Sequence, residues 1–252
     1  MSGSGSVVSI DRRMRLWSLA AAYAGGESVT VEHVCITATS ATGTDGAAIA
    51  VALTATPRET IYSSNRLASE AEELSLILGE GPCVDALAGG LALVPDLSTT
   101  HCLARWPVFA PAVVAAGVRA IFALPLQVGA IRLGVLDLYR AEPGDLHQEQ
   151  LLDALTLADT ACALLLDGTG HGAPQAPGRI LEPAGLQHPE VHQATGMISV
   201  QLGLSAALAL VRLRAYAYVN DRRLRDVARD VVARRLRFDP EGSDDSGRSD
   251  GD

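Results

Sequence analysis

Lysine is absent from this sequence of 252 residues, so arginine supplies all 20 of its permanent positive side-chain charges. GC-rich coding favours arginine over lysine, and the number of arginines is therefore weak evidence of function. Aromatic residues are also few, at 4% of the chain, although hydrophobic residues make up 48%. This length and composition suit a globular chain with one ordinary domain and one small domain.

Long hydrophobic runs are lacking as well. No stretch reaches 18 uninterrupted apolar residues, and the opening MSGSGSVVSIDRRMR lacks the charge-then-apolar order of a signal peptide. We therefore expect a cytoplasmic protein without a membrane partner.

Cysteine is scarce and dispersed. Cys35, Cys83, Cys102 and Cys162 show no C-x-x-C spacing, which argues against a zinc cluster and against a disulfide framework. Buried free thiols are the expected state. Cys83, in the turn-like stretch GEGPC, is the candidate for a redox sensor.

Catalytic motifs are missing too. Gly79-x-Gly81 has no third glycine and does not lead from a strand into a helix, so it is not a dinucleotide fingerprint. The sequence contains no nucleophile elbow, no Walker loop and no kinase-type pairing of a histidine with an ATPase. We predict no catalytic residue, no metal site and no cofactor.

An uneven distribution of charge is the first positive signal. Residues 1–178 hold nine Arg against 18 acids, a net charge of about −9, whereas residues 191–238 hold nine Arg against three Asp, about +6. Residues 239–252 hold six acids and one Arg, about −5. Charges act mainly within a Debye length of about 8–10 Å, so these local values matter more than the overall net charge. A basic module therefore lies within an acidic chain.

Residues 10–167 predict an α+β domain, an antiparallel sheet with helices packed on it. The apolar spacing indicates helices at 10–25, 29–41 (capped by Ser28), 67–78, 106–117 and 146–166. Short apolar runs indicate strands at 46–55, 59–65, 90–97, 118–128 and 131–140. The last two runs are joined by a tight turn at Gly129 and form the clearest hairpin signal.

Two segments lack the pattern of a packed element. Residues 168–179 are dense in Gly and Pro and predict a linker. Residues 239–252 have nothing to bury and predict a disordered acidic tail. Between them, residues 180–238 form the second predicted domain.

This second domain is predicted to be all-α, with three helices. The first runs from about Glu190 to Gln201 and is closed by Gly203, Ser205 caps the second, and Asn220 or Asp221 caps the third. The apolar set predicted for the first helix is Val191, Ala194, Met197, Ile198 and Val200. The stripe predicted for the second is Ala206, Leu210, Leu213 and Ala217, and that for the third is Leu224, Val227, Ala228, Val231, Val232 and Leu236.

Arginines occupy the positions beside these stripes. They are Arg212, Arg214, Arg222, Arg223, Arg225, Arg229, Arg234, Arg235 and Arg237. Two interpretations stay open at this point: the positive flank of a nucleic-acid-binding unit, or a solvated helix face whose arginines pair with Asp221, Asp226 and Asp230.

The stretch HQATGMISVQLGLSAALALVRLRAYAYVNDRRLRDVARDVVARRL resembles the ANTAR family of bacterial RNA-binding antitermination domains over its full length. The matching positions are Ala194, Gly196, Ser205, Ala209, Leu213, Arg214, Ala217, Leu224, Val227 and Ala228. One departure is Thr195, because many members carry lysine there, and it predicts that one cationic phosphate contact is missing.

The resemblance implies that stem-loop RNA in nascent transcripts is the partner. Proteins read the splayed bases of RNA loops by hydrogen bonds and stacking, and arginine forms fork-like contacts with phosphate. The candidate RNA-binding residues are Gln193, Ala194, Thr195, Gly196, Arg212, Arg214, Ala217, Tyr218, Arg222 and Arg223. The small residues among them would admit the RNA backbone, or else would only permit tight helix packing.

The first domain resembles GAF sensory domains over about residues 12–166, on the stretches GEGPCVDAL, RWPVF, GVRAIFALPL and RLGVLDLYR. Members of that superfamily bind cyclic nucleotides, tetrapyrroles or other small molecules, or serve as dimer scaffolds. The candidate ligand-binding residues are Cys83, Asp85, Asp96, Arg105 and Trp106, although Trp106 is more simply explained as a core anchor at the start of a helix. His101 is expected on the surface.

These expectations combine into a signal-responsive regulator of transcription antitermination. A signal sensed by the first domain would change the geometry of a homodimer, paired through the apolar helices at 10–25 and 148–166, or the exposure of the RNA-binding module. Two alternatives remain: a DNA-binding transcription factor with a helix-turn-helix, and a protein-interaction module that binds no nucleic acid.

Overall fold

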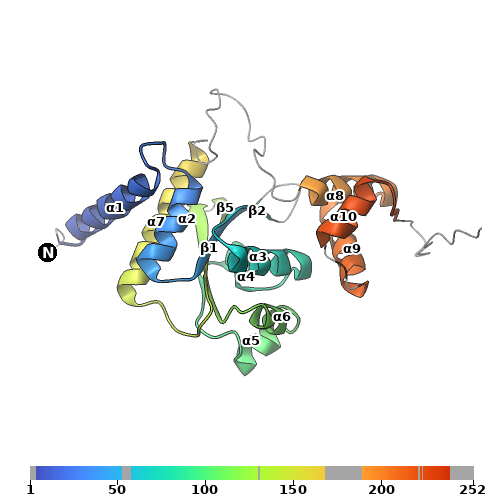
Figure 1. Ribbon diagram of the computed structural model, residues 1–252, viewed down its shortest axis with the longest axis horizontal. Helices are drawn as coiled ribbons and strands as arrows, with labels where there is room; N and C mark the ends of the chain where they lie inside the picture. Colours follow the sequence, from blue (N-terminus) through green and yellow to red (C-terminus); the bar gives the residue numbers. More distant parts are fainter. Residues whose placement is uncertain are drawn as a thin grey trace, which may run out of the picture. The chain divides into compact units, whose positions relative to one another are not determined.

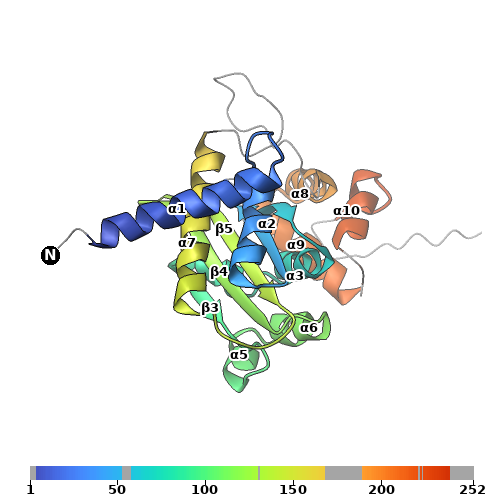
Figure 2. The same cartoon turned by 60° about the vertical axis from the view of Figure 1, so that its left-hand side comes forward.

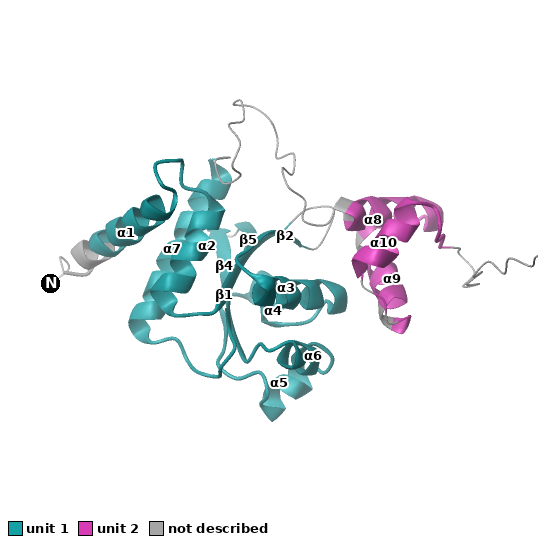
Figure 3. Cartoon of the chain, in the orientation of Figure 1, with its two compact units in different colours: residues 1–52, 58–187 teal, residues 53–57, 188–252 magenta. Residues whose placement is uncertain are grey.

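A computed structural model of the chain describes residues 4–52, 58–129, 131–167, 189–220, 222 and 224–238. Contacts divide the chain into two compact units, residues 1–52 with 58–187 and residues 53–57 with 188–252 (Figure 3). The predicted linker 168–179 and the predicted acidic tail 239–252 lie outside the described residues. None of the helices in the described ranges is long and apolar enough to cross a membrane.

The N-terminal unit is built on a five-stranded antiparallel sheet in the order β2-β1-β5-β4-β3. The strands are β1 (Gly46–Val51), β2 (Glu59–Ser63), β3 (Ala92–Val94), β4 (Ala120–Val128) and β5 (Ile131–Arg140). The predicted hairpin is confirmed, since β4 and β5 pair along their whole length, from Ala120 opposite Arg140 to Val128 opposite Ile131.

Gly134 of β5 allows β1 to approach closely. A Cβ atom at this position would lie 2.1 Å from the backbone oxygen of Ala50 in β1. No side chain can replace this glycine unless the two strands separate, so the pairing of β1 with β5 depends on it.

Helices cover both faces of this sheet (Figures 1 and 2). On one side α1 (Ser4–Tyr23), α2 (Val31–Thr42) and α7 (Gln148–Leu166) contribute to a core that includes Ala47 and Ile49 of β1. On the other, α3 (Arg66–Leu78), α4 (Pro82–Gly89) and α6 (Phe109–Ala115) pack around Ala48 and Ala50. The alternation along β1 follows from the two-residue period of a strand.

Two short helices were not predicted from the sequence, α4 and α5 (Thr100–Arg105). The stretch GEGPC looks turn-like in the sequence, but Pro82 is the first residue of α4, where its fixed φ and missing N–H suit a helix start. The predicted cap Ser28 was also wrong. Thr30 is the N-cap of α2, and its backbone N–H donates to His33 Nδ1 at 3.0 Å.

The second unit contains the three predicted helices: α8 (Pro189–Leu202), α9 (Ala206–Val219) and α10 (Leu224–Val232). Gly203 follows α8 at a φ of +63°, and the Ser205 hydroxyl accepts from the backbone N–H of Leu208 at 3.4 Å. The residues buried in this unit are Val191, Ala194, Thr195, Ile198, Ala209, Leu210, Leu213, Ala217, Leu224, Val227, Ala228 and Val231. Val200, predicted to be buried, is 85% exposed.

Candidate nucleic-acid interface and sensory pocket

Helix α9 presents two different sides. Leu210, Leu213 and Ala217 are buried, whereas Arg212 is exposed and forms no ion pair within the described part of the chain. Arg214 is half-buried, and the side chain of Tyr218 lies outside what the structure describes. Of the predicted RNA-binding residues of α9, Arg212 therefore has an unneutralised charge at the surface.

The first half of α8 also has exposed residues on one side and buried residues on the other. Gln193 and Gly196 are exposed, and a Cβ atom added at Gly196 would meet nothing within 4 Å. Ala194 and Thr195 are buried, and the Thr195 hydroxyl donates to the backbone oxygen of Val191 at 2.7 Å. Position 195 thus points inward, so a phosphate contact from it needs a different arrangement of the helix.

Small size at Ala194 and Ala217 serves the packing of the helices on one another. Both side chains have no exposed surface, so the interpretation that they admit the RNA backbone is not supported by their position. A buried alanine at a helix crossing lets two helix backbones approach closely, and a larger side chain there would push them apart.

Most arginines around α10 pair with acids. Arg222 Nη2 lies 2.5 Å from one oxygen of Asp230, and Arg235 Nη2 lies 2.7 Å from the other. Hydrogen bonds from Arg222 and then Arg235 lower the pKa of Asp230. Arg225 and Arg229 reach Glu190 at the start of α8, at 3.5 and 3.8 Å. The solvated, salt-bridged face that the sequence left open therefore describes this side of the unit well.

Three arginines of the unit are exposed and form no ion pair among the described residues: Arg212, Arg234 and Arg237. Arg223 lies outside the described residues. We call Arg212, Arg234 and Arg237 the free arginine set, because among the described residues of this unit they are exposed cations that no described acid neutralises.

Sequence reasoning missed an apolar side of α9. Leu208, Val211 and Val219 are 53, 54 and 80% exposed. The helix contains no acid and only two arginines, and a helix that is hydrophobic all round is normally covered on more than one side. That composition was a signal for a second contact surface.

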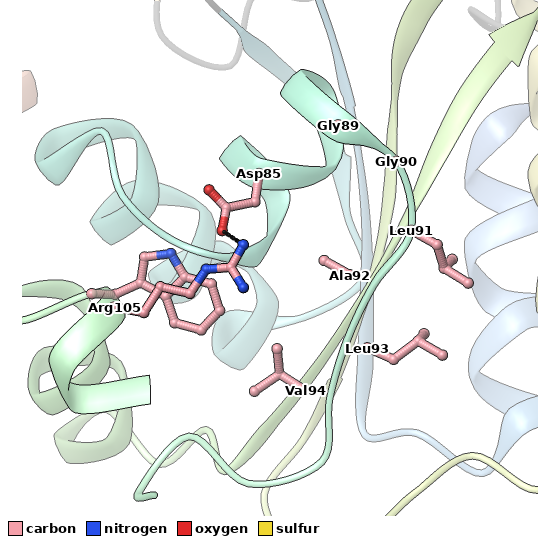
Figure 4. A pocket seen from close by; sticks show the side chains of 9 residues that line it. Asp85, Gly89, Gly90, Leu91, Ala92, Leu93, Val94 and Arg105 are labelled. Carbon is pink, nitrogen blue, oxygen red and sulfur yellow. Dashed lines mark ion pairs between the residues drawn. The ribbon is translucent and has the colours of Figure 1, made fainter. Parts of the chain in front are cut away.

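A cavity of about 360 Å³ opens in the N-terminal unit beside β3 (Figure 4). Its lining residues come from α4, β3, the connection between these two elements and the end of α5: Asp85, Gly89, Gly90, Leu91, Ala92, Leu93, Val94, Arg105 and Trp106. Arg105 Nη2 lies 2.8 Å from Asp85 Oδ2, and the guanidinium carbon lies 5.1 Å from the Trp106 ring centroid. The cavity thus combines a paired donor and acceptor with apolar walls.

Three of the five predicted ligand-binding residues meet at this cavity, namely Asp85, Arg105 and Trp106. Asp96 lies outside the lining; it accepts from the Ser98 hydroxyl and backbone N–H and lies 3.4 Å from Arg119, contacts that lower its pKa. Trp106 is 5% exposed and belongs to the core, so the core-anchor interpretation also holds. His101 is exposed on α5.

A buried polar cluster lies on the face of the sheet that α3 covers, and no pattern in the sequence predicted it. Glu72 of α3 accepts from the Thr60 hydroxyl at 2.6 Å, from Arg58 Nη2 at 2.9 Å and from the Tyr139 hydroxyl. All four side chains are buried. The cluster joins residues from different elements, so no local motif reports it.

Asp137 of β5 completes this cluster. It has no exposed surface, and neither carboxyl oxygen meets the geometry of a hydrogen bond within the described residues. Burial, and then the negative charge of Glu72, raise the pKa of Asp137 well above its ordinary value. Its carboxyl group is therefore held in the neutral form more strongly than that of an ordinary aspartate.

Cys83 also belongs to this region. Its Sγ lies 2.8 Å from the Ser75 hydroxyl, and burial raises the pKa of the thiol to about 12. Because the thiolate is the reactive species, this environment does not activate Cys83 for redox chemistry. The prediction of buried free thiols is confirmed for all four cysteines.

Comparison with models of protein families gives a match in the second unit. The model of the ANTAR domain matches residues 181–232, a range that includes α8, α9 and α10. Residues 181–232 form an ANTAR domain. The resemblance seen in the sequence is confirmed for this part of the chain. No curated protein matches the chain.

The solved structures that are similar to the chain include GAF domains. One is the GAF domain of a phosphoenolpyruvate-protein phosphotransferase from Acinetobacter, with 13% identity, 66% of this chain and 97% of that chain covered, and a TM-score of 0.46. The corresponding domain from Coxiella burnetii has 14% identity, covers 66 and 96%, and has a TM-score of 0.42. The GAF domain of the cyanobacteriochrome TePixJ has 15% identity, covers 53 and 85%, and has a TM-score of 0.40.

Proposed function

We propose that this protein is a signal-responsive regulator of transcription antitermination whose ANTAR domain binds stem-loop RNA in nascent transcripts. The observation that carries the proposal is the ANTAR match over three helices that pack on one another. On their surface Arg212 keeps its charge free of any described acid. Such a guanidinium can form fork-like contacts with phosphate at little cost, since no ion pair with an acid of the described residues must be broken.

Competition binding tests this proposal. Full-length protein is titrated with an RNA of two adjacent stem-loops and with duplex DNA of the same sequence, at matched salt. We expect the RNA to bind more tightly, and Arg212→Ala to weaken RNA binding and reduce the slope of log K against log salt by about 1. Arg13→Ala, which removes an exposed arginine of the other unit, is the matched control. Equal affinity for duplex DNA would instead support the helix-turn-helix alternative.

For the N-terminal unit we propose a GAF-type sensory role in a domain of residues 10–167, separated from an RNA-binding domain of residues 180–238. The cavity beside β3 supports it, because Asp85 and Arg105 offer an acceptor and donors next to apolar walls. A small molecule bound there would shift the protein only if it bound one arrangement better than the other. Thermal unfolding of the native chain and of Arg105→Ala, each with and without a ligand that stabilises the native chain, tests this role. We expect the ligand to raise the unfolding temperature of the native chain and not that of Arg105→Ala.

We also propose that the regulator acts as a homodimer. On α1, Ile10, Met14 and Trp17 recur at i, i+4 and i+7 and are 59, 66 and 47% exposed, and Leu166 of α7 is 58% exposed. Apolar side chains with this spacing form the seam between paired helices. Light scattering should give twice the monomer mass for the native chain and the monomer mass for Met14→Glu. A monomeric native chain at tens of micromolar would refute this part.

The exposed apolar side of α9 favours a second candidate function, recruitment of a protein partner. Leu208, Val211 and Val219 would then form the contact, and the arginines would only keep the surface soluble. If Arg212→Ala left stem-loop affinity unchanged while Val211→Asp abolished activity in a transcription assay, this candidate would replace RNA binding.

A further inference from the structure

Residue 238 is held on the ANTAR domain beside α9. The backbone N–H of Phe238 donates to Gln201 Oε1 of α8 at 3.2 Å. Its ring meets that of Tyr216 edge-on, with the ring centroids 5.4 Å apart. The acidic residues 239–252 therefore begin at a defined point on the surface of this domain.

That point lies next to the free arginine set. Arg212 precedes Tyr216 by four residues on α9, so their side chains lie on the same side of the helix, about 5–6 Å apart at Cβ. Arg237 directly precedes Phe238 in the chain, Arg234 lies four positions before it, and both are exposed. A chain that leaves Phe238 thus starts within reach of all three cations.

The charge of residues 239–252 complements this surface. They carry Asp239, Glu241, Asp244, Asp245, Asp250 and Asp252 against one arginine, Arg248. The root-mean-square span expected for any 14-residue coil is about 20 Å, similar to the roughly 21 Å length of a 14-residue helix such as α9. Tethering at such a distance gives an effective concentration of about a millimolar, at which weak ionic contacts are populated.

We propose that residues 239–252 dock on the free arginine set of their own ANTAR domain and compete with RNA for it. The competition rests on the proposed RNA-binding function, whereas the docking itself does not. RNA has a higher density of negative charge and displaces the segment. A polyanion that binds the free arginine set more weakly than the segment does is therefore excluded.

Zero-length crosslinking tests the docking without RNA. Because the chain contains no lysine, Arg212→Lys introduces a single side-chain amine that a carbodiimide joins only to a carboxylate in contact with it. We expect crosslinks from this amine to residues 239–252 at low salt, several-fold above those from Arg13→Lys, and their loss in 1 M salt, where the Debye length is about 3 Å. Arg237 is unsuitable because Asp239 follows it so closely. Equal yields from the two variants would overturn the proposal.

RNA binding tests the competition. A full-length variant with the six acids of residues 239–252 changed to Asn or Gln should bind the two-stem-loop RNA about 3- to 10-fold more tightly than the native chain at low salt and equally at high salt. Positive crosslinking with unchanged RNA affinity would refute the competition but keep the docking. If neither chain bound RNA while the crosslinks formed, the proposed function would fail and the docking would stand.

Discussion

The two units of this protein treat their charges in opposite ways. The N-terminal unit buries Arg58, Glu72 and Asp137 together inside its fold, whereas the ANTAR domain holds its arginines at the surface, where some pair with Asp230 or Glu190 and others stay free. Buried charges of unlike sign are costly to separate, and surface pairs are worth little. The first arrangement specifies a fold, and the second leaves charge available to a partner.

The largest loss of stability is expected at Arg58, and it tests whether the buried charges matter more to the fold than the exposed ones. Arg58→Met leaves the Glu72 carboxylate buried without its cation, and we expect it to lower the free energy of unfolding by about 3–5 kcal/mol. Trp17 and Trp106, the two tryptophans of the chain, both lie in the N-terminal unit, so urea unfolding followed by tryptophan fluorescence reports on this unit. Arg66→Met, which breaks the exposed pair with Glu70, is the control and should cost about 0–1 kcal/mol. Similar losses in the two variants would show that the buried cluster has no special weight.

An intermediate effect should separate packing from RNA contact in the ANTAR domain. Ala217→Leu forces a larger side chain into a position with no exposed surface and should cost about 1–3 kcal/mol of domain stability. Ala215→Leu, at an exposed position of the same helix, is the control. Thermal unfolding by circular dichroism measures the difference, and the tryptophan transition should stay unchanged. If Ala217→Leu left stability intact but abolished RNA binding, position 217 would be a contact residue after all.

The smallest expected effect is on the pH dependence of the free energy of unfolding. It again compares a buried acid of the N-terminal unit with a surface acid of the ANTAR domain. Because Asp137 has a raised pKa in the folded state, the native chain binds more protons than the unfolded chain, so stability falls as pH rises above the ordinary aspartate range. The slope from this group can reach about 1.4 kcal/mol per pH unit and should be flatter in Asp137→Asn. In the ANTAR domain Asp230 has a lowered pKa, so its contribution is lost as pH falls. An unchanged slope in Asp137→Asn would contradict the assignment.

Local sequence signals predicted most of the elements. The hairpin of β4 and β5 was visible because two apolar runs flank a glycine turn, and α8 to α10 were visible because their apolar side chains recur at helical spacing. The two helices that were missed, α4 and α5, have 8 and 6 residues, too few for a periodic pattern to stand out. Val200 was placed wrongly because an apolar residue next to a stripe cannot be told from one inside it.

Of the two candidate sites in the N-terminal unit, one could be predicted from the sequence and the other could not. Asp85, Arg105 and Trp106 could be proposed as pocket residues because they lie in segments of the sequence that read as loop-rich, and all three line the cavity beside β3. The buried cluster of Arg58, Glu72, Asp137 and Tyr139 could not be predicted, because its members lie as many as 81 positions apart by residue number and meet only through the sheet.

By itself, the sequence determined that the chain has an acidic α+β part and a basic helical part, because local charge and hydrophobic period are properties of neighbouring residues. Only the tertiary structure decided which charges are neutralised, since ion pairs such as Arg58 with Glu72 or Arg225 with Glu190 form between elements that the chain brings together on folding. The same step separated Arg212, which keeps an accessible charge, from Ala194 and Ala217, which are closed inside the domain.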